Sequence, residues 1–252
     1  MANQSSLGRR LVAEALGTAF LLAVVIGSGI MAERLAGGNV AIALLANTLA
    51  TGAGLVALIL TFGSISGAHF NPVVSLADAS QGGMRWRDVG PHIVAQIVGA
   101  FVGAAVAHAM FGEPTFSASH HVRSGLAQMV SEFVATFGLL SVIWGCSRAR
   151  PQATPFAVGA YITAAYWFTS STSFANPAVT LARAASDTFA GIRPADAPGF
   201  IIAQILGAAC ATAIFRWLVP ALPKVAPNVV TPSAEPEERD EQDPVRVYSQ
   251  RR

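Results

Sequence analysis

Six apolar segments separated by short polar stretches dominate the pattern of hydrophobic and polar positions along the chain. A transmembrane helix needs about 20 consecutive, mostly apolar residues, and the segments meet or approach that length. They are Leu11–Ala32, Val40–Gly63, Val89–Phe111, Leu126–Cys146, Ala153–Ser170 and Gly199–Val219, of which the fifth is the shortest. The pattern predicts six transmembrane helices, and the first segment is too long for the core of a cleavable signal peptide.

Composition sets the limits of this membrane domain. Of the 252 residues, 53% are hydrophobic and only 12% are charged, which is more apolar than a soluble domain of this length. We expect residues 1–219 to form the membrane domain. Residues 220–252 are rich in Pro, Glu, Asp and Arg and predict a disordered, cytoplasmic tail.

Arginines in the short loops predict the orientation, because cytoplasmic loops carry more Lys and Arg. Six crossings place both termini on one side. That side would carry Arg9, Arg10, Arg85, Arg87, Arg148 and Arg150, against Arg34, Arg123, Arg183 and Arg193 on the other. Both termini are therefore predicted to be cytoplasmic. The net charge of +2 comes from residues at helix ends rather than from one basic patch, so we expect no nucleic-acid partner.

The order of motifs in the first half of the chain is repeated in the second. A Val-x-Glu sequence contains Glu14 in one half and Glu132 in the other, an Asn-Pro pair follows at Asn71 and Asn176, and Ala-Gln-Ile-Val/Leu-Gly-Ala comes last. The halves, about residues 8–111 and 126–219, each contain three crossings. Because three is odd, the second half is inverted relative to the first, and the Asn-Pro segments should enter the membrane from opposite faces.

Each Asn-Pro pair predicts the start of a short helix, since Asn is a favoured N-cap and Pro is favoured in the first turn. From Asn71 to Ala79 such a helix rises about 13 Å, roughly half the apolar thickness of a membrane. Two half-helices would together complete a seventh span. Non-helical backbone at that depth is tolerated only where it is buried in protein or lines a water-filled cavity, so the pattern predicts a pore.

These paired motifs resemble those of the aquaporin and aquaglyceroporin family over about residues 8–219. The resemblance implies an all-α membrane protein with six transmembrane helices plus two re-entrant half-helices in an inverted three-helix repeat. It implies a passive channel for small uncharged solutes that excludes ions and protons. No enzymatic activity, cofactor or metal is expected. Partners would be neutral solutes, the lipid of the inner cell membrane and three further copies in a homotetramer.

The resemblance also assigns roles to particular residues. The central pore motifs would be Asn71, Pro72, Val73, Asn176, Pro177 and Ala178. The asparagine amides can donate N–H groups to a passing solute, and the half-helix N-termini, each with about half a positive charge, repel cations. Glu14 and Glu132 would support the re-entrant loops, with a proton relay as the alternative. Gln96 and Gln204 would hydrogen-bond between helices.

This chain departs from the family pattern at the outer constriction. Arginine usually follows the second motif, and Val179 stands there instead. The other constriction positions fall on Thr51, on Ser173 and on Tyr166, or on Ala164 if the loop has no gap. Such a filter would be wider and less charged, and would admit larger uncharged solutes. Arg183, one turn beyond Val179, would supply a charge at the outer mouth or face lipid headgroups.

Histidines offer two further candidates. By resemblance His69 lies near the cytoplasmic entrance of the pore, where it would either gate by protonation or make a fixed loop hydrogen bond. His120 and His121 have no cysteine or carboxylate at ligand spacing, so we expect no metal site.

The sequence from Asn176 to Arg183, with Ser186 to Ile192, resembles bacterial aquaglyceroporins of the arsenic-resistance type. Arsenite is an uncharged trihydroxide at neutral pH and is similar in shape to glycerol. The sequence does not rank water, glycerol, urea, arsenite and methylated arsenic as solutes. The alternatives are a strict water channel, a secondary carrier and a non-conducting variant of the same fold.

Overall fold

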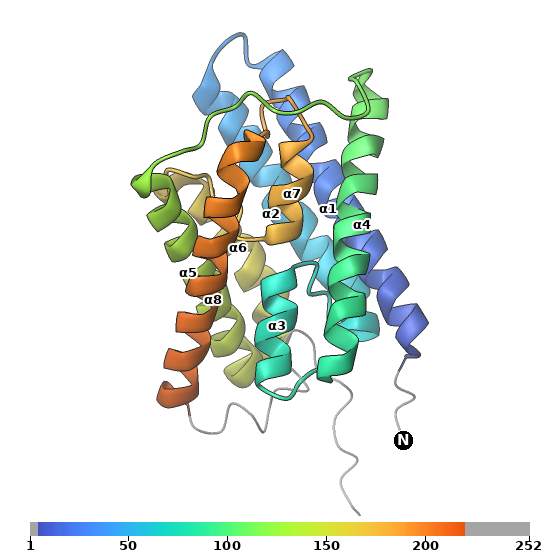
Figure 1. The fold of residues 1–252 in the computed structure, drawn as a ribbon, viewed down its shortest axis with the longest axis vertical. Helices are drawn as coiled ribbons and strands as arrows, with labels where there is room; N and C mark the ends of the chain where they lie inside the picture. Colours follow the sequence, from blue (N-terminus) through green and yellow to red (C-terminus); the bar gives the residue numbers. More distant parts are fainter. Residues whose placement is uncertain (1–4, 220–252) are drawn as a thin grey trace, which may run out of the picture.

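The apolar segments form helices that run along the long axis of the molecule (Figure 1). The computed structural model describes residues 5–219, so the predicted tail of residues 220–252 lies outside the described part. Within residues 5–219, five helices are long and apolar enough to cross a membrane. They are α1 (Leu7–Leu35), α2 (Val40–Ser66), α4 (Trp86–Phe111), α5 (Leu126–Ala149) and α8 (Ala197–Leu218).

The fifth predicted segment forms the shortest of the predicted crossings. A 3-10 turn at Pro151–Ala153 precedes α6 (Thr154–Phe168), which has 15 residues and is therefore only about 22 Å long. The helix ends where Thr169 adopts extended backbone, and the Thr169 hydroxyl donates to the carbonyl of Ala165 at 2.6 Å. The polar loop that follows α6 forms part of the site described below.

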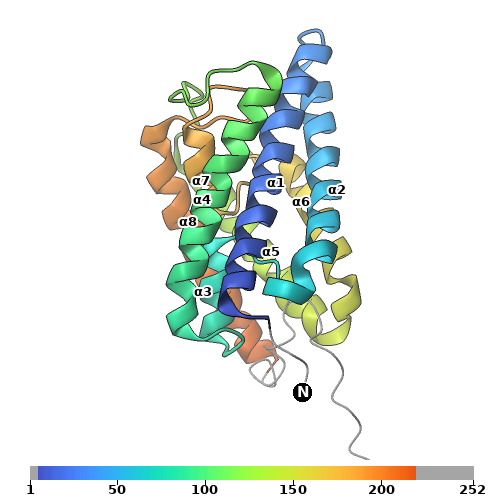
Figure 2. The same ribbon diagram turned by 90° about the vertical axis from the view of Figure 1, so that its right-hand side faces the viewer.

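The two Asn-Pro pairs begin helices, as predicted. They cap α3 (Pro72–Ser80) and α7 (Pro177–Ala184). Asn71 Oδ1 accepts the N–H of Val73 at 3.1 Å, and Asn176 Oδ1 accepts the N–H of Ala178 at 3.0 Å. In Figures 1 and 2, α3 lies in the half of the bundle nearer the start of α1 and α7 in the other half. We call these two ends of the bundle proximal and distal.

Small residues bring the long helices together in the same way in both halves. A side chain at Gly99 of α4 would collide with the carbonyl of Ala15 on α1, and one at Gly207 of α8 with that of Phe133 on α5. Such close contacts are typical of helices that associate in a membrane. Each half-helix lies against both α4 and α8. Helices from the two halves therefore enclose both half-helices, which is the arrangement that the inverted repeat predicts.

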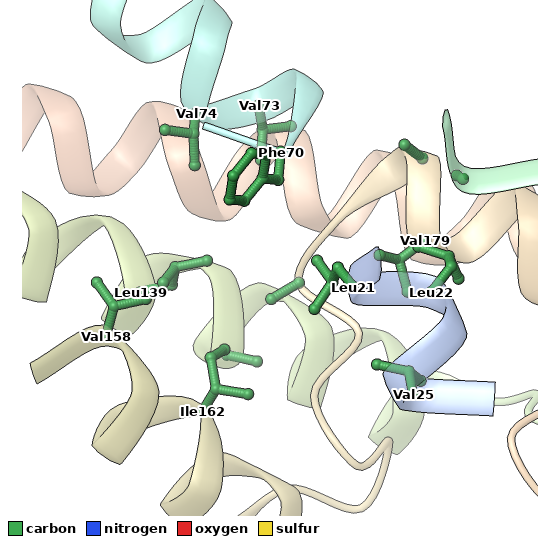
Figure 3. Close-up of a cluster of buried hydrophobic side chains, with 14 of the residues drawn as sticks. Leu21, Leu22, Val25, Phe70, Val73, Val74, Leu139, Val158, Ile162 and Val179 are labelled. Atoms are coloured by element: carbon green, nitrogen blue, oxygen red, sulfur yellow. The ribbon is translucent and has the colours of Figure 1, made fainter. Parts of the chain in front are cut away.

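The buried apolar cluster contains side chains from both halves. In Figure 3, Leu21 of α1 and Val74 of α3 come from the first half, and Leu139 of α5, Ile162 of α6 and Val179 of α7 from the second. These five residues also line a cavity inside the bundle.

Candidate channel and its constriction

Two buried glutamates hold the loops that precede the half-helices. Glu14 accepts hydrogen bonds from the Ser66 hydroxyl, from the backbone N–H groups of His69 and Phe70 and from the Gln96 amide, at 2.7, 3.0, 2.7 and 2.8 Å. Both of its oxygens therefore have two donors, which is close to the capacity of a carboxylate.

Glu132 repeats this arrangement in the second half. It accepts from the Ser171 hydroxyl, the N–H groups of Phe174 and Ala175 and the Gln204 amide, at 2.6, 2.9, 2.9 and 2.6 Å. Both carboxylates are fully buried. A buried carboxylate is costly unless hydrogen bonds satisfy it, and here loop N–H groups supply part of that compensation.

The loops have a backbone that non-glycine residues rarely adopt. Ala68 and Phe70 have φ of 49°, and the equivalent Ser173 and Ala175 have φ of 52° and 47°. Each such residue costs about 1 kcal/mol or more unless its surroundings fix it. Because the N–H of Phe70 and that of Ala175 both donate to a glutamate, the carboxylates help to hold these conformations.

The half-helices are joined at their N-termini through their asparagines. Asn71 Nδ2 donates to the carbonyl of Ala175, and Asn176 Nδ2 to the carbonyl of Phe70, both at 2.8 Å. An amide nitrogen carries two hydrogens, so one N–H of each asparagine is used across this junction. The sequence predicts that the amides of both asparagines donate N–H groups to a solute. In the structure, one N–H of each amide is used across the junction and one remains for a solute.

A cavity of about 70 Å³ passes this junction and is lined by both asparagines. That volume is enough for a few water molecules. Its walls are mostly apolar and include Leu21, Leu139 and Ile162. The polar groups are few, so a solute in the cavity would have hydrogen-bond partners only at particular positions.

The four predicted constriction residues all line this cavity. Thr51, Tyr166, Ser173 and Val179 are each at most 5% exposed. The hydroxyls of Thr51 and Tyr166 are 3.3 Å apart, and Ser173 Oγ is buried with no partner among residues 5–219. Of the two alternatives on α6, Tyr166 lines the cavity while Ala164 lies on the exposed face of the helix.

Four of the six central motif residues lie outside the cavity. Asn71 and Asn176 line it, but the neighbouring Pro72, Val73, Pro177 and Ala178 do not. Val73 borders a different pocket, between α3 and α8. The valine in the first motif therefore does not narrow the channel, and it is Val74, one residue further along the helix, that reaches the wall.

Arg183 lies inside the protein rather than at a lipid-facing surface. It is 2% exposed, lines the cavity at its distal end and donates from Nε to the carbonyl of Ala190. Its Cζ is 3.3 Å from the centre of the Phe174 ring, and Cζ of Arg123 is 5.1 Å from the same centre. The sequence signalled Arg183 by its helical spacing from Val179, but nothing in it pointed to Arg123 or Phe174.

His69 also lines the cavity, on the proximal side. Its Nδ1 is 3.0 Å from Ser75 Oγ, and its Nε2 is 3.6 Å from Asp78 Oδ2. A fixed hydrogen bond is therefore present, as one of the two predicted alternatives requires. Asp78 is buried and was not singled out in the sequence.

His120 has a carboxylate partner that is distant in the sequence. Its Nδ1 lies 2.8 Å from Asp187 Oδ2, and its N–H donates to Asp187 Oδ1 at 2.8 Å. These hydrogen bonds lower the pKa of the Asp187 carboxyl below its usual 3.8. Within residues 5–219 no three His, Cys, Asp or Glu side chains are grouped so that they could hold a metal ion.

This geometry is that of a membrane channel built around two half-helices. A family model described as "Major intrinsic protein" matches residues 1–169 and 149–239, and the chain belongs to this family. It is 56% identical over 218 residues to the aquaglyceroporin AqpS of Rhizobium meliloti, covering 86% of this chain and 93% of that protein. It is 28% identical over 227 residues to Aquaporin Z of Bradyrhizobium diazoefficiens, covering 83% and 93%.

A solved structure agrees with this fold. The X-ray structure of the aquaglyceroporin from Plasmodium falciparum matches with a TM-score of 0.68 at 21% identity, over 86% of this chain and 99% of that one. The predicted aquaporin-like fold is therefore confirmed. By its family the protein is a channel for water and small uncharged solutes and not an enzyme.

Proposed function

We propose that the protein is a passive channel whose constriction passes uncharged solutes larger than water, such as glycerol. The observation that carries this proposal is the composition of the four constriction positions. Thr51, Tyr166, Ser173 and Val179 place hydroxyl groups and one branched alkyl group around the cavity, with no charged side chain among them. A polyol has hydroxyls for the polar groups and a carbon chain for the apolar wall.

The junction of the half-helices is proposed as the barrier to ions. The N-termini of α3 and α7 meet there, each with about half a positive charge, and each asparagine has one N–H left for a solute oxygen. A cation would lose its hydration shell and meet positive dipoles. An uncharged hydroxyl meets neither penalty.

We assign Glu14 and Glu132 to loop support rather than proton transfer. Each carboxylate accepts four hydrogen bonds from neighbouring protein groups. Protonation would replace an acceptor with a donor beside other donors, so a relay would disrupt the loops at each cycle. We assign His69 to a fixed contact at the proximal end of the cavity.

Placement in the membrane follows from the same features. We place the protein in the inner membrane of the cell. By the positive-inside rule its proximal end, with Arg85 and Arg87, faces the cytoplasm. One chain encloses its own cavity, so each subunit of a homotetramer would conduct independently. The uncharged constriction, together with the similarity in shape of arsenite and glycerol, also makes arsenite a proposed solute alongside glycerol.

The test is stopped-flow permeability of proteoliposomes to water, glycerol, urea and arsenite. Val179→Arg introduces a guanidinium into the constriction. We expect it to reduce glycerol and arsenite permeability by about tenfold or more and water permeability by less. Val73→Ala is the matched control, since it alters the valine of the first motif, whose side chain lies outside the cavity.

Two results would contradict the proposal. If Val179→Arg conducts glycerol and arsenite as the parent does, Val179 is not at the constriction. If a proton gradient collapses through the parent channel as fast as solute moves, the junction is not an ion barrier.

A further inference from the structure

Four arginines of the described chain lie at the distal end, and in this part of the chain only two of their guanidinium groups have a carboxylate partner. Arg34 Nη2 is 2.7 Å from Glu113, and Arg193 Nη2 is 2.7 Å from Asp196. Within residues 5–219, the guanidinium groups of Arg123 and Arg183 have no carboxylate oxygen within 4.0 Å, although the backbone N–H of Arg123 donates to Asp196 Oδ2 at 2.9 Å. Their charges are therefore not neutralised by a direct ion pair.

Backbone carbonyls hold both guanidinium groups in place. Arg123 donates from Nε to Gly191 at 2.8 Å and from Nη1 to Ser171 at 3.2 Å, and Arg183 donates from Nε to Ala190. Carbonyl groups fix the orientation of a cation but carry no formal charge. Burial lowers the pKa of Arg123 from its usual value, as expected for a cation with little solvation.

The two arginines share one aromatic ring. Both Cζ atoms lie near the centre of the Phe174 ring, at 3.3 Å for Arg183 and 5.1 Å for Arg123. The face of an aromatic ring attracts a cation, so Phe174 stabilises both. It does not remove the repulsion between two positive charges in a poorly solvated site, which an anion between them would.

Both arginines have donors that make no hydrogen bond and that border a partly open cavity. Among the described residues, Arg183 Nη1 and Nη2 and Arg123 Nη2 make no hydrogen bond, and none of these atoms is sealed from solvent. Both side chains line a second cavity of about 260 Å³ at the distal end. Arg183 lines the channel cavity as well, so it lies where the two spaces meet.

We propose that the distal cavity binds a small oxyanion between Arg123 and Arg183, and that the bound anion occludes the distal mouth of the channel. The guanidinium fork matches the oxygen pairs of carboxylate and phosphate groups. The occupant is a free anion rather than a lipid headgroup, because Arg183 is only 2% exposed and opens onto the channel cavity. The occlusion, but not the binding, rests on the proposed channel function.

Binding is tested by calorimetry of the purified full chain with inorganic phosphate at constant ionic strength, with chloride as the balancing anion. We expect saturable binding that weakens by about tenfold or more in Arg123→Gln and in Arg183→Gln. Arg34→Gln is the matched control: it removes one distal arginine, which is paired with Glu113, and should bind as the parent does. Arg183 is buried, so Arg183→Gln can misfold. Two variants keep the test valid in that case: Arg123→Gln, at a half-buried position, and Arg183→Lys, which keeps the charge but lacks the guanidinium fork and should also bind phosphate more weakly.

Occlusion is tested by glycerol permeability of phosphatidylcholine proteoliposomes with phosphate outside, relative to the flux in chloride. Phosphate should lower the parent flux saturably and leave that of Arg123→Gln unchanged. Undiminished parent flux in phosphate would overturn occlusion, whereas no parent flux in chloride would instead overturn the channel proposal.

Absence of saturable binding, or an equal loss in Arg34→Gln, would overturn the anion site. Inhibition that appears only when phosphatidylglycerol replaces part of the lipid, without added phosphate, would identify a lipid headgroup as the occupant and overturn the free-anion proposal.

Discussion

Replacing Glu132 with glutamine tests whether the carboxylates hold the re-entrant loops. The substitution keeps the shape of the side chain but turns one oxygen, which accepts two hydrogen bonds, into an amide donor. If that oxygen is Oε2, the N–H of Ala175 and the amide of Gln204 lose their acceptor. If it is Oε1, the Ser171 hydroxyl and the N–H of Phe174 lose theirs.

The magnitude follows from the number of bonds lost. A hydrogen bond to a charged group contributes about 1.5–3 kcal/mol, so losing two costs about 3–6 kcal/mol. One local rearrangement reduces this loss. Gln204 Oε1 has no partner in the described structure, and a flip of that amide would let it accept from the new donor. We therefore expect Glu132→Gln to destabilise the protein by about 2–6 kcal/mol.

The assay is unfolding by SDS in mixed micelles, together with glycerol permeability. The matched control is Glu113→Gln, which removes a partly exposed carboxylate paired with Arg34 and should cost about 1 kcal/mol or less. Glu14→Gln should resemble Glu132→Gln, because Gln96 Oε1 is also without a partner. If Glu132→Gln unfolds and conducts as Glu113→Gln does, the carboxylate does not hold the loop and the reasoning is refuted.

Three further predictions concern packing and the distal loop. Gly207→Val would collide with the α5 backbone and should lower the free energy of unfolding in SDS by about 1–3 kcal/mol, as overpacking does; an unchanged unfolding free energy would contradict the close helix contact. Val73→Ala should lose about 1–2 kcal/mol from its buried site without changing glycerol permeability, and a changed permeability would place Val73 in the channel. Because the pKa of Asp187 is lowered by its hydrogen bonds from His120, its contribution to folding is present above the usual value of 3.8 and is lost as the pH falls below it. Protease protection of residues 112–125 should therefore fall below about pH 3.8 in the parent, and an equal fall in Asp187→Asn would argue against this contact.

The features that sequence predicted depend on local patterns. Transmembrane segments follow from apolar runs, and the half-helices follow from Asn71 and Asn176, since capping and proline placement act within one turn. Glu14 and Glu132 mark the repeat in the sequence, because carboxylates are rare in membrane segments. A buried carboxylate also needs a specific set of hydrogen-bond partners. Two of the four partners of each glutamate are loop N–H groups, which no side-chain pattern reveals.

Other features depend on how distant loops are placed. Arg123 reaches the Phe174 ring from the loop between α4 and α5, and His120 meets a carboxylate 67 residues away. No short-range signal encodes either contact. The choice between Ala164 and Tyr166 depended on the length of the loop that follows α6, and Val73 was placed in the pore by its motif although its side chain points elsewhere.

The inverted repeat also explains why the two ends of the channel can differ in charge. A shift of 105 residues relates Asn71 to Asn176, and the same shift relates His69 to Phe174 and Asp78 to Arg183. In the first half Nε2 of His69 lies 3.6 Å from Oδ2 of Asp78. In the second half the centre of the Phe174 ring lies 3.3 Å from Cζ of Arg183.

Equivalent positions thus carry opposite charges, although the hydrogen bonds of the two glutamates are nearly identical. The loops must keep those hydrogen bonds because their backbone has positive φ at equivalent residues. Asp78 and Arg183, about two turns into their half-helices, have no such constraint. A duplicated backbone can therefore place a basic group at the distal end and an acidic group at the proximal end, so that an anion is attracted to only one mouth of the channel.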